Sequence, residues 1–226
     1  MHALRTCLSA ALATGALTSA LSVAPFAAPL AAHADSGPSA RTVADGAPQL
    51  DPLAKAAAGL PKVGPGDVLK LAASQVGISE NANGGGTKFQ QWYMSTPRAR
   101  ETLSRDGGTL SGYANAPWCD MFVSWVGQKL GIQPVMGSDA YTVEHARWFA
   151  AHNRWGTVPK PGAVVFFSWS GSKNFDDIDH VGFVVKDNGN GTIRTIEGNA
   201  GGGAVQIRNR PTSSITGYGY PYYTAP

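Results

Sequence analysis

At Pro161-Gly162 the spacing of apolar residues changes from a helical period to a strand period. Before this point, apolar residues recur three and four positions apart, as on one face of a helix. After it, they come in short runs rich in β-branched and aromatic residues, and glycine turns separate the runs. We therefore expect an α+β domain in which N-terminal helices pack on one side of an antiparallel β-sheet.

Helical spacing predicts four segments in the first part of the chain: 67–77, a short one near 89–93, 117–130 and 138–151. Proline is tolerated in the first turn of a helix, which suits Pro117, and Asn115 just ahead of it is a candidate cap. Residues 95–116 carry Pro97 and several glycines, so we expect no regular element there.

The second part predicts a meander of strands at 163–169, 180–186, 192–199 and 204–210, with a last edge strand within 218–223. The strongest turn signal, Asn-Gly-Asn-Gly at 188–191, joins two of these strands as a hairpin. The strand that begins at His180 should therefore lie beside the strand that carries Glu197.

The first 34 residues predict an export signal. Arg5 precedes a long run of Ala, Leu, Val and Ser, which ends in the A-x-A cleavage pattern at 32–34. The alternative is a transmembrane anchor, but Pro25 and Pro29 interrupt the run, and no later stretch is long enough to span a bilayer. We therefore expect a secreted protein, extracellular or associated with the cell wall.

Residues 35–64 are rich in Ala, Pro and Gly and show no sustained apolar period. This composition predicts a disordered linker or leader arm. The order of the chain is then a signal at 1–34, an arm at 35–64 and one domain at 65–226. We expect this domain to be a monomer.

Charge excludes several classes of partner. The formal net charge is +3, and loss of Arg5 with the signal would leave about +2, which is too little to indicate a nucleic-acid or membrane partner. The glycine runs lack the Gly-Lys-Ser/Thr of a phosphate loop, and the histidines lack zincin spacing. We expect no cofactor and no metal. The acidic stretch 176–179 is open to two interpretations, a cation site and a solvated loop, and we favour the solvated loop.

Cys119 is the first candidate for chemistry. Removal of the signal would also remove Cys7, the only other cysteine. A lone cysteine in a secreted protein is an inert buried thiol, half of an intermolecular bridge, or a reactive group. In the first turn of the helix predicted at 117–130, N–H groups and the helix dipole would favour a thiolate and could receive an oxyanion.

His180 is the candidate base for such a thiol. Three histidines follow the signal, and His145 and His152 fall on or near one predicted helix, where we interpret them as helix-surface or partly buried imidazoles. His180 instead opens a strand, and strand ends project side chains into clefts. Gly182 lies on the same face, and we expect it to leave open space beside the imidazole.

Two polar residues on the neighbouring strand are candidate partners of this histidine. Glu197 and Asn199 are two positions apart, which places them on one face of a regular strand. Glu197 could hold the tautomer of the ring, and Asn199 could orient the ring or help to bind the oxyanion. The alternatives are a solvent-facing strand residue for Glu197 and a turn residue for Asn199.

Four segments, in order along the chain, resemble the CHAP family of cysteine- and histidine-dependent amidohydrolases and peptidases. Residues 117–125, Pro-Trp-Cys-Asp-Met-Phe-Val-Ser-Trp, resemble its W-C-x-x-F-V-S-W helix. Residues 161–167 resemble its P-G-D strand, with Ala163 in place of the aspartate. Residues 180–184, His-Val-Gly-Phe-Val, resemble its H-x-G-x-V strand, and residues 195–199 resemble its E-G-N strand.

The resemblance implies a papain-like fold, of the kind also found in the NlpC/P60 family. It implies catalytic roles for Cys119, His180 and Glu197, with Asn199 in support. It also implies peptidoglycan or its peptide stems as substrate, cleaved by an N-acetylmuramoyl-L-alanine amidase or by a stem or cross-bridge endopeptidase.

Two other functions remain open: an NlpC/P60-type endopeptidase, whose usual D-C-S-G context is absent here, and a non-catalytic wall-binding module. Four aromatic residues are candidates to line a substrate groove, although each could equally pack in the core. They are Trp118, Trp92, Tyr93 and Trp169.

Overall fold

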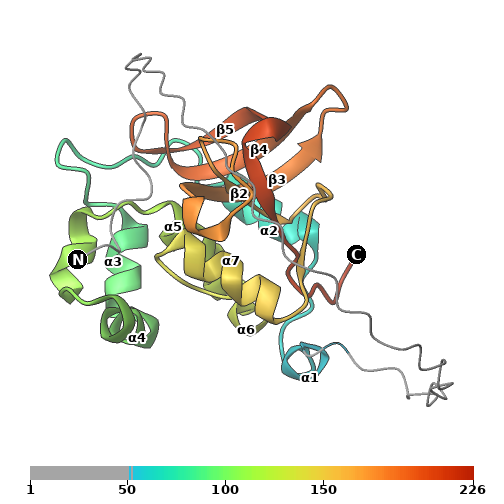
Figure 1. The fold of residues 1–226 in the computed structure, drawn as a ribbon. Coiled ribbons are helices and arrows are strands. Elements are labelled where there is room, and N and C mark those ends of the chain that lie inside the picture. Colours follow the sequence, from blue (N-terminus) through green and yellow to red (C-terminus); the bar gives the residue numbers. More distant parts are fainter. Residues whose placement is uncertain (1–50, 52) are drawn as a thin grey trace, which may run out of the picture. The chain divides into compact units, whose positions relative to one another are not determined.

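The computed structural model describes residue 51 and residues 53–226 (Figure 1), so the predicted signal at 1–34 and most of the arm lie outside the described residues. The helices of this part, including the 3₁₀ segment η1, are α1 (Ala54–Ala57), α2 (Pro65–Ala73), α3 (Lys88–Ser95), α4 (Pro97–Asp106), η1 (Leu110–Asn115), α5 (Cys119–Lys129), α6 (Gln133–Met136) and α7 (Thr142–Ala151). Within the described part of the chain, none of them has the length and apolar character to cross a membrane.

Strands follow the helices, as expected. They are β1 (Trp155–Gly156), β2 (Val164–Phe167), β3 (His180–Asp187), β4 (Thr192–Ala200), β5 (Ala204–Pro211) and β6 (Ile215–Gly219), with 3₁₀ turns η2 (Phe175–Asp177) and η3 (Thr212–Ser214) between them. They form one sheet in the order β1-β6-β2-β3-β4-β5, and all neighbours are antiparallel. The predicted α+β class is confirmed.

The alternation of side chains gives the sheet two different faces. On one face, Val164, Phe166 and Phe183 join the large apolar core that the helices also build. On the other, Val165, Phe167 and their neighbours form a smaller apolar cluster among strands. Helix α5 lies against β3 and β4 (Figure 1), and α7 contacts β1 and β6. The N-terminus of α5 is thereby brought to the sheet.

The prediction that residues 95–116 are irregular was wrong, because this segment forms α4 and η1. Pro97 begins α4 and does not break it: the hydroxyl of Thr96 accepts a hydrogen bond from the N–H of Ala99 at 3.1 Å and caps the helix. Likewise, α5 starts at Cys119 with Trp118 as N-cap residue, whereas the predicted cap Asn115 ends η1.

The described part of the predicted arm packs against the rest of the fold. Leu53, Ala57 and Val63 are buried in the main core. The carboxylate of Asp51 forms an ion pair with Arg154 at 2.8 Å. Residues 53–64 thus add to the core of the domain that we expected to begin at residue 65.

Candidate active site

His180 and Glu197 form a buried pair where β3 begins. Nε2 of His180 lies 3.0 Å from Oε2 of Glu197, and the two side chains are 3% and 0% exposed. Because the carboxylate can only accept, it fixes the imidazole proton on Nε2. Base chemistry at this ring therefore falls to Nδ1. The predicted pairing of adjacent strands brings these two residues together.

Gly182 makes this pairing possible, but not by leaving open space as we expected. A Cβ at this position would lie 2.7 Å from Cγ of Glu197 and 2.9 Å from the carbonyl oxygen of Ile196. The stem of the glutamate fills the volume beside the imidazole. Glycine is thus required for the close approach of the acid to β3.

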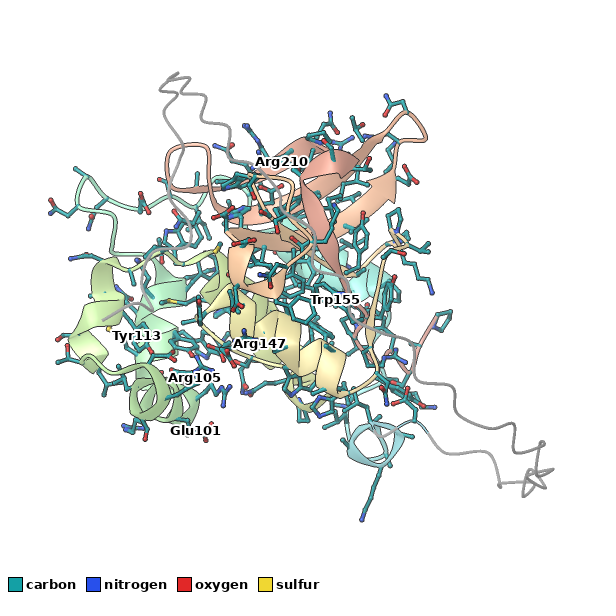
Figure 2. All side chains as sticks on the ribbon, viewed as in Figure 1. Glu101, Arg105, Tyr113, Arg147, Trp155 and Arg210 are labelled. Atoms are coloured by element: carbon teal, nitrogen blue, oxygen red, sulfur yellow. The ribbon has the colours of Figure 1, made fainter. Side chains whose placement is uncertain are left out.

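Sequence reasoning missed Arg210, which lies on β5 (Figure 2) and binds the same carboxylate. Its Nε donates to Oε1 of Glu197 at 2.9 Å, and its Nη2 donates to Oε2 at 2.6 Å. The hydroxyl of Thr195 donates to Oε1 at 2.6 Å. In the hairpin register, Arg210 pairs with Ile193, which places it on the face of the sheet that carries Glu197.

The hydrogen-bond donors around Glu197 keep its carboxylate ionised. Burial alone would raise its pKa, but the hydrogen bonds from His180 and Arg210 outweigh burial and lower the pKa of Glu197 to about 2. The carboxylate is therefore ionised at neutral pH and can orient and stabilise a protonated imidazole.

Trp169 covers the imidazole. Its ring lies 5.5 Å from that of His180 with a 30° tilt, and it stacks on Phe167 at 5.7 Å. The guanidinium of Arg210 lies 5.0 Å from the same indole ring. Trp169 is 37% exposed. Of the four candidate groove aromatics, it is the one that contacts the histidine.

The other three aromatics pack among the helices. Trp118 is fully buried, stacks on Phe89 at 5.3 Å and donates from Nε1 to Glu80 at 2.8 Å. Tyr93 is also fully buried. Trp92 is half-buried, with its ring centroid 6.0 Å from that of Tyr93. Their contacts are those of core residues.

Cys119 is the first residue of α5 and is 1% exposed. The N-cap residue Trp118 makes no side-chain hydrogen bond to the N–H groups of the first turn. Such groups stabilise a thiolate or an oxyanion. A nucleophilic role requires the thiol form of Cys119.

Asn199 links the start of this helix to β4. The amide of Asn199 is oriented so that both of its hydrogen bonds are made. Its oxygen accepts from the N–H of Trp118 at 3.1 Å, and its nitrogen donates to the carboxylate of Glu80 at 3.2 Å. The pairing of β4 with β5 is irregular between Glu197 and Ala200, and Asn199 has a left-handed φ of 54°. The regular alternation that we expected across Glu197 and Asn199 is therefore interrupted.

Gly198 allows helix α5 and strand β4 to approach each other closely. A Cβ there would lie 2.6 Å from Cβ of Phe122, one turn along α5 from Cys119. Helix α5 thus rests directly on β4 at this point. The first turn that carries Cys119 is held beside the strand that carries Glu197.

A second buried acid–imidazole pair lies behind the first turn of α5. Nδ1 of His145 is 2.7 Å from Oδ1 of Asp120, and its Nε2 is 2.9 Å from the carbonyl oxygen of Met136. The interpretation of His145 as a surface or partly buried residue was wrong, since it is 1% exposed. Burial raises the pKa of Asp120, while Asp120 raises the pKa of His145 despite its burial. The pair anchors α5 to α7.

The acidic stretch 176–179 is engaged by protein groups. Asp176 pairs with Arg147, Asp177 accepts from the hydroxyl of Ser172, and Asp179 accepts from the N–H of Trp169. Among the described residues, no three His, Cys, Asp or Glu side chains gather as metal ligands would.

Comparison with known proteins gives one match. Residues 111–199 match the family model described as CHAP domain. No curated protein and no solved structure matches the chain. The matched segment runs from η1 to the end of β4 and includes Cys119, His180 and Glu197. Residues 111–199 are thus similar to the CHAP domain family, whose papain-like fold is consistent with the helices and the antiparallel sheet described above.

Proposed function

We propose that the protein is a secreted, monomeric cysteine hydrolase that cleaves amide bonds of peptidoglycan through an acyl-enzyme on Cys119. The CHAP domain indicates activity of the peptidoglycan-hydrolase type. The observation that carries the finer proposal is the buried hydrogen bond between His180 and Glu197, on two strands that both contact helix α5. This pair supports a role for His180 as base and for Glu197 as the acid that orients it, with Cys119 at the start of the helix that contacts their strands.

The reaction follows from these positions. Nδ1 of His180 takes the thiol proton, and Sγ of Cys119 attacks the amide carbonyl carbon. The N–H groups of the first turn receive the oxyanion. The C–N bond then breaks, the proton passes from His180 to the leaving amine, and water hydrolyses the thioester with His180 as base. Glu197 remains ionised throughout.

The reaction needs the thiol form of Cys119. Export with cleavage after residue 34 would remove Cys7, the only other cysteine of the chain. The processed protein would then carry one thiol and could form no internal disulfide. Iodoacetamide should label it well below the ordinary thiol pKa near 8.5 if His180 activates it.

Mass spectrometry of fragments released from purified peptidoglycan tests the proposal. We expect the reduced wild-type protein to release fragments with new amino termini, and we expect Cys119→Ala and His180→Gln to release none. His152→Gln is the matched control, because His152 is the C-cap residue of α7 and its Nδ1 bonds to the carbonyl of Trp148, away from Glu197. Release by Cys119→Ala, or no release by the wild type, would exclude the proposal.

The same experiment separates the alternatives. A non-catalytic wall-binding module would sediment with peptidoglycan but release nothing. Cleavage within the stem or cross-bridge would identify an endopeptidase, and cleavage between the lactyl group and L-alanine would identify an amidase.

A further inference from the structure

Glu80, in the loop between α2 and α3, carries a carboxylate close to the candidate nucleophile in the fold. Its Oε2 accepts a hydrogen bond from Nε1 of Trp118 at 2.8 Å, and Trp118 directly precedes Cys119. The same oxygen accepts from the amide nitrogen of Asn199 at 3.2 Å. Glu80 lies outside the segment 111–199 that matches the family model, so the match assigns it no role.

The backbone of Glu80 is fixed to the turn that joins β4 and β5. Its N–H donates to the carbonyl of Gly203 at 2.8 Å. The preceding residue, Ser79, forms an isolated antiparallel bridge with Ala204, the first residue of β5. The loop therefore runs beside the sheet at this point, and the sheet sets the position from which the side chain of Glu80 extends.

Gly203 leaves room for that side chain. A Cβ at Gly203 would lie 2.1 Å from Oε1 of Glu80, which is far inside contact distance. Gly203 also has a left-handed φ of 79°, a conformation that favours glycine. The carboxylate is therefore held between this turn and the indole of Trp118.

Trp118 links these contacts to the nucleophile, because three of its polar groups are bonded. Its backbone carbonyl accepts from the N–H of Phe122 at 3.0 Å, at the start of α5. Its backbone N–H donates to the amide oxygen of Asn199, and its indole N–H donates to Glu80. Since Cys119 is the next residue, a shift of Trp118 would move the thiol with it.

The polar groups of this network fit together in one orientation only. An indole N–H and a backbone N–H can only donate, and a carboxylate can only accept. The amide of Asn199 must therefore turn its nitrogen to Glu80 and its oxygen to Trp118. The carboxylate thus determines which way the amide of Asn199 points.

We propose that Glu80 is a positioning residue for the nucleophile: it holds Trp118 and the amide of Asn199, and through them it fixes Cys119 relative to His180. This inference rests on the function proposed above and deepens it. Asn199 then acts by holding the start of α5, and not as a donor to the oxyanion. The loop before α3 becomes part of the support of the site.

Iodoacetamide labelling of the reduced protein measures the position of the thiol without a substrate. Mass spectrometry of the peptide that contains Cys119 gives the rate at each pH, and the wild type should reach half its maximal rate well below about pH 8.5. Glu80→Ala should raise this midpoint by about one pH unit, because the thiol is displaced from its base. Glu80→Gln keeps an oxygen that can accept both hydrogen bonds and should not raise it.

The sign of this shift separates position from charge. Removal of a negative charge near a thiol favours the thiolate and by itself lowers the midpoint. A midpoint in Glu80→Ala at or below that of the wild type would therefore overturn the inference. So would a rise in Glu80→Gln as large as the rise in Glu80→Ala.

Turnover of peptidoglycan should follow the same order. Glu80→Ala should lower kcat by about tenfold to a hundredfold with little change in KM, since a displaced nucleophile affects the chemical step. Glu80→Gln should keep most of the rate. Glu144→Ala is the matched control, because Glu144 is also half-buried but forms its ion pair with Arg147 on α7. Equal losses of kcat in Glu80→Ala and Glu144→Ala would contradict the positioning role.

An exchange of polarity tests the contact even if Glu80→Ala fails to fold. Asn199→Asp places a second carboxylate against Glu80 and should lower kcat by at least about tenfold. When Glu80→Gln is added, the new amide can donate to the new carboxylate while its oxygen accepts from Trp118, so most of the loss should be recovered. A double variant as inactive as Asn199→Asp would show that Asn199 acts through another contact, and the inference would fail.

Failure of the proposed function would look different. A wild type that releases nothing from peptidoglycan and whose thiol reacts only near about pH 8.5 would exclude the hydrolase itself. An active wild type that Glu80→Ala equals in both labelling midpoint and kcat would exclude only the role of Glu80.

Discussion

At the scale of single residues, the site is organised around the charge of Glu197. This carboxylate is fully buried, and an isolated charge there would be costly. Its oxygens receive hydrogen bonds from His180, Arg210 and Thr195. Because the pKa of Glu197 is lower in the folded protein than its ordinary value of 4.5, its ionisation stabilises the fold above that value, and this stability is lost as pH falls toward about 2.

Arg210→Met should remove most of this effect. The pKa of Glu197 should rise, the acid-induced loss of stability should begin at higher pH, and the free energy of unfolding at neutral pH should fall by about 3 kcal/mol. Arg210→Lys keeps the charge but not the bidentate contact. The pKa of Glu197 and the free energy of unfolding of this variant should therefore lie between those of the wild type and of Arg210→Met. Denaturant unfolding at neutral and acidic pH measures both effects.

Arg208→Met is the control for this prediction. Arg208 is half-buried on the same strand and face, but it bonds to Gln206 instead of Glu197. Its substitution should change the unfolding free energy by less than about 0.5 kcal/mol. An equal loss of unfolding free energy in Arg210→Met and Arg208→Met would mean that the contact of Arg210 with Glu197 adds nothing to stability.

At the scale of elements, close approach between neighbours positions the site. Two glycines permit it: Gly182 admits the stem of Glu197 beside β3, and Gly198 admits Phe122 of α5 beside β4. Neither glycine has a left-handed φ, so what they supply is the absence of a side chain and not an unusual backbone.

Gly182→Ala should therefore destabilise the protein by about 1–3 kcal/mol, because the new methyl group meets strand backbone that cannot move aside. It should also lower kcat by on the order of a hundredfold, since the acid and base are displaced. Thermal unfolding and turnover of peptidoglycan measure the two effects.

Gly66→Ala is the matched control, since nothing lies within 4 Å of a Cβ at this position in α2. It should leave activity unchanged and stabilise the protein by up to about 1 kcal/mol. If Gly182→Ala behaves like Gly66→Ala, the packing of Glu197 against β3 is unimportant.

The sequence predicted elements well where glycine turns separate them, and this explains why β3, β4 and β5 begin at the expected residues. It failed for α4, since Pro97 was interpreted as a breaker although proline also begins helices. The His180–Glu197 pair followed from adjacent strands. The contact between Arg210 and Glu197 could not be predicted in this way. It depends on the register of the hairpin formed by β4 and β5 and on the irregularity near Asn199.

At the scale of the whole molecule, the segment before α2 and the end of the chain pack together. The carbonyl of Val63 accepts hydrogen bonds from the N–H groups of Thr224 and Ala225 at 3.2 Å each. Leu53 and Ala57 are buried in the same core. The domain therefore depends on residues that the composition of the sequence assigned to an arm.

A chain that begins at residue 65 should be less stable than one that begins at residue 51. Loss of the buried Leu53 and Val63 alone should cost about 3 kcal/mol, which corresponds to a fall in Tm of about 6–12 °C. Asp51→Asn, which removes only the partly exposed ion pair with Arg154, should cost less than about 1 kcal/mol. Calorimetry of the chain from residue 51, of its Asp51→Asn variant and of the chain from residue 65 measures these differences. Equal melting temperatures would contradict the contribution of residues 53–64 to stability.

The tilt of Trp169 over His180 has an optical consequence. A charged imidazole next to an indole quenches its light emission, whereas a neutral one does so weakly. The emission of this tryptophan thus depends on the proton that the ring of His180 gains and loses. The protein therefore carries its own optical reporter of the charge on the residue that we propose as its base.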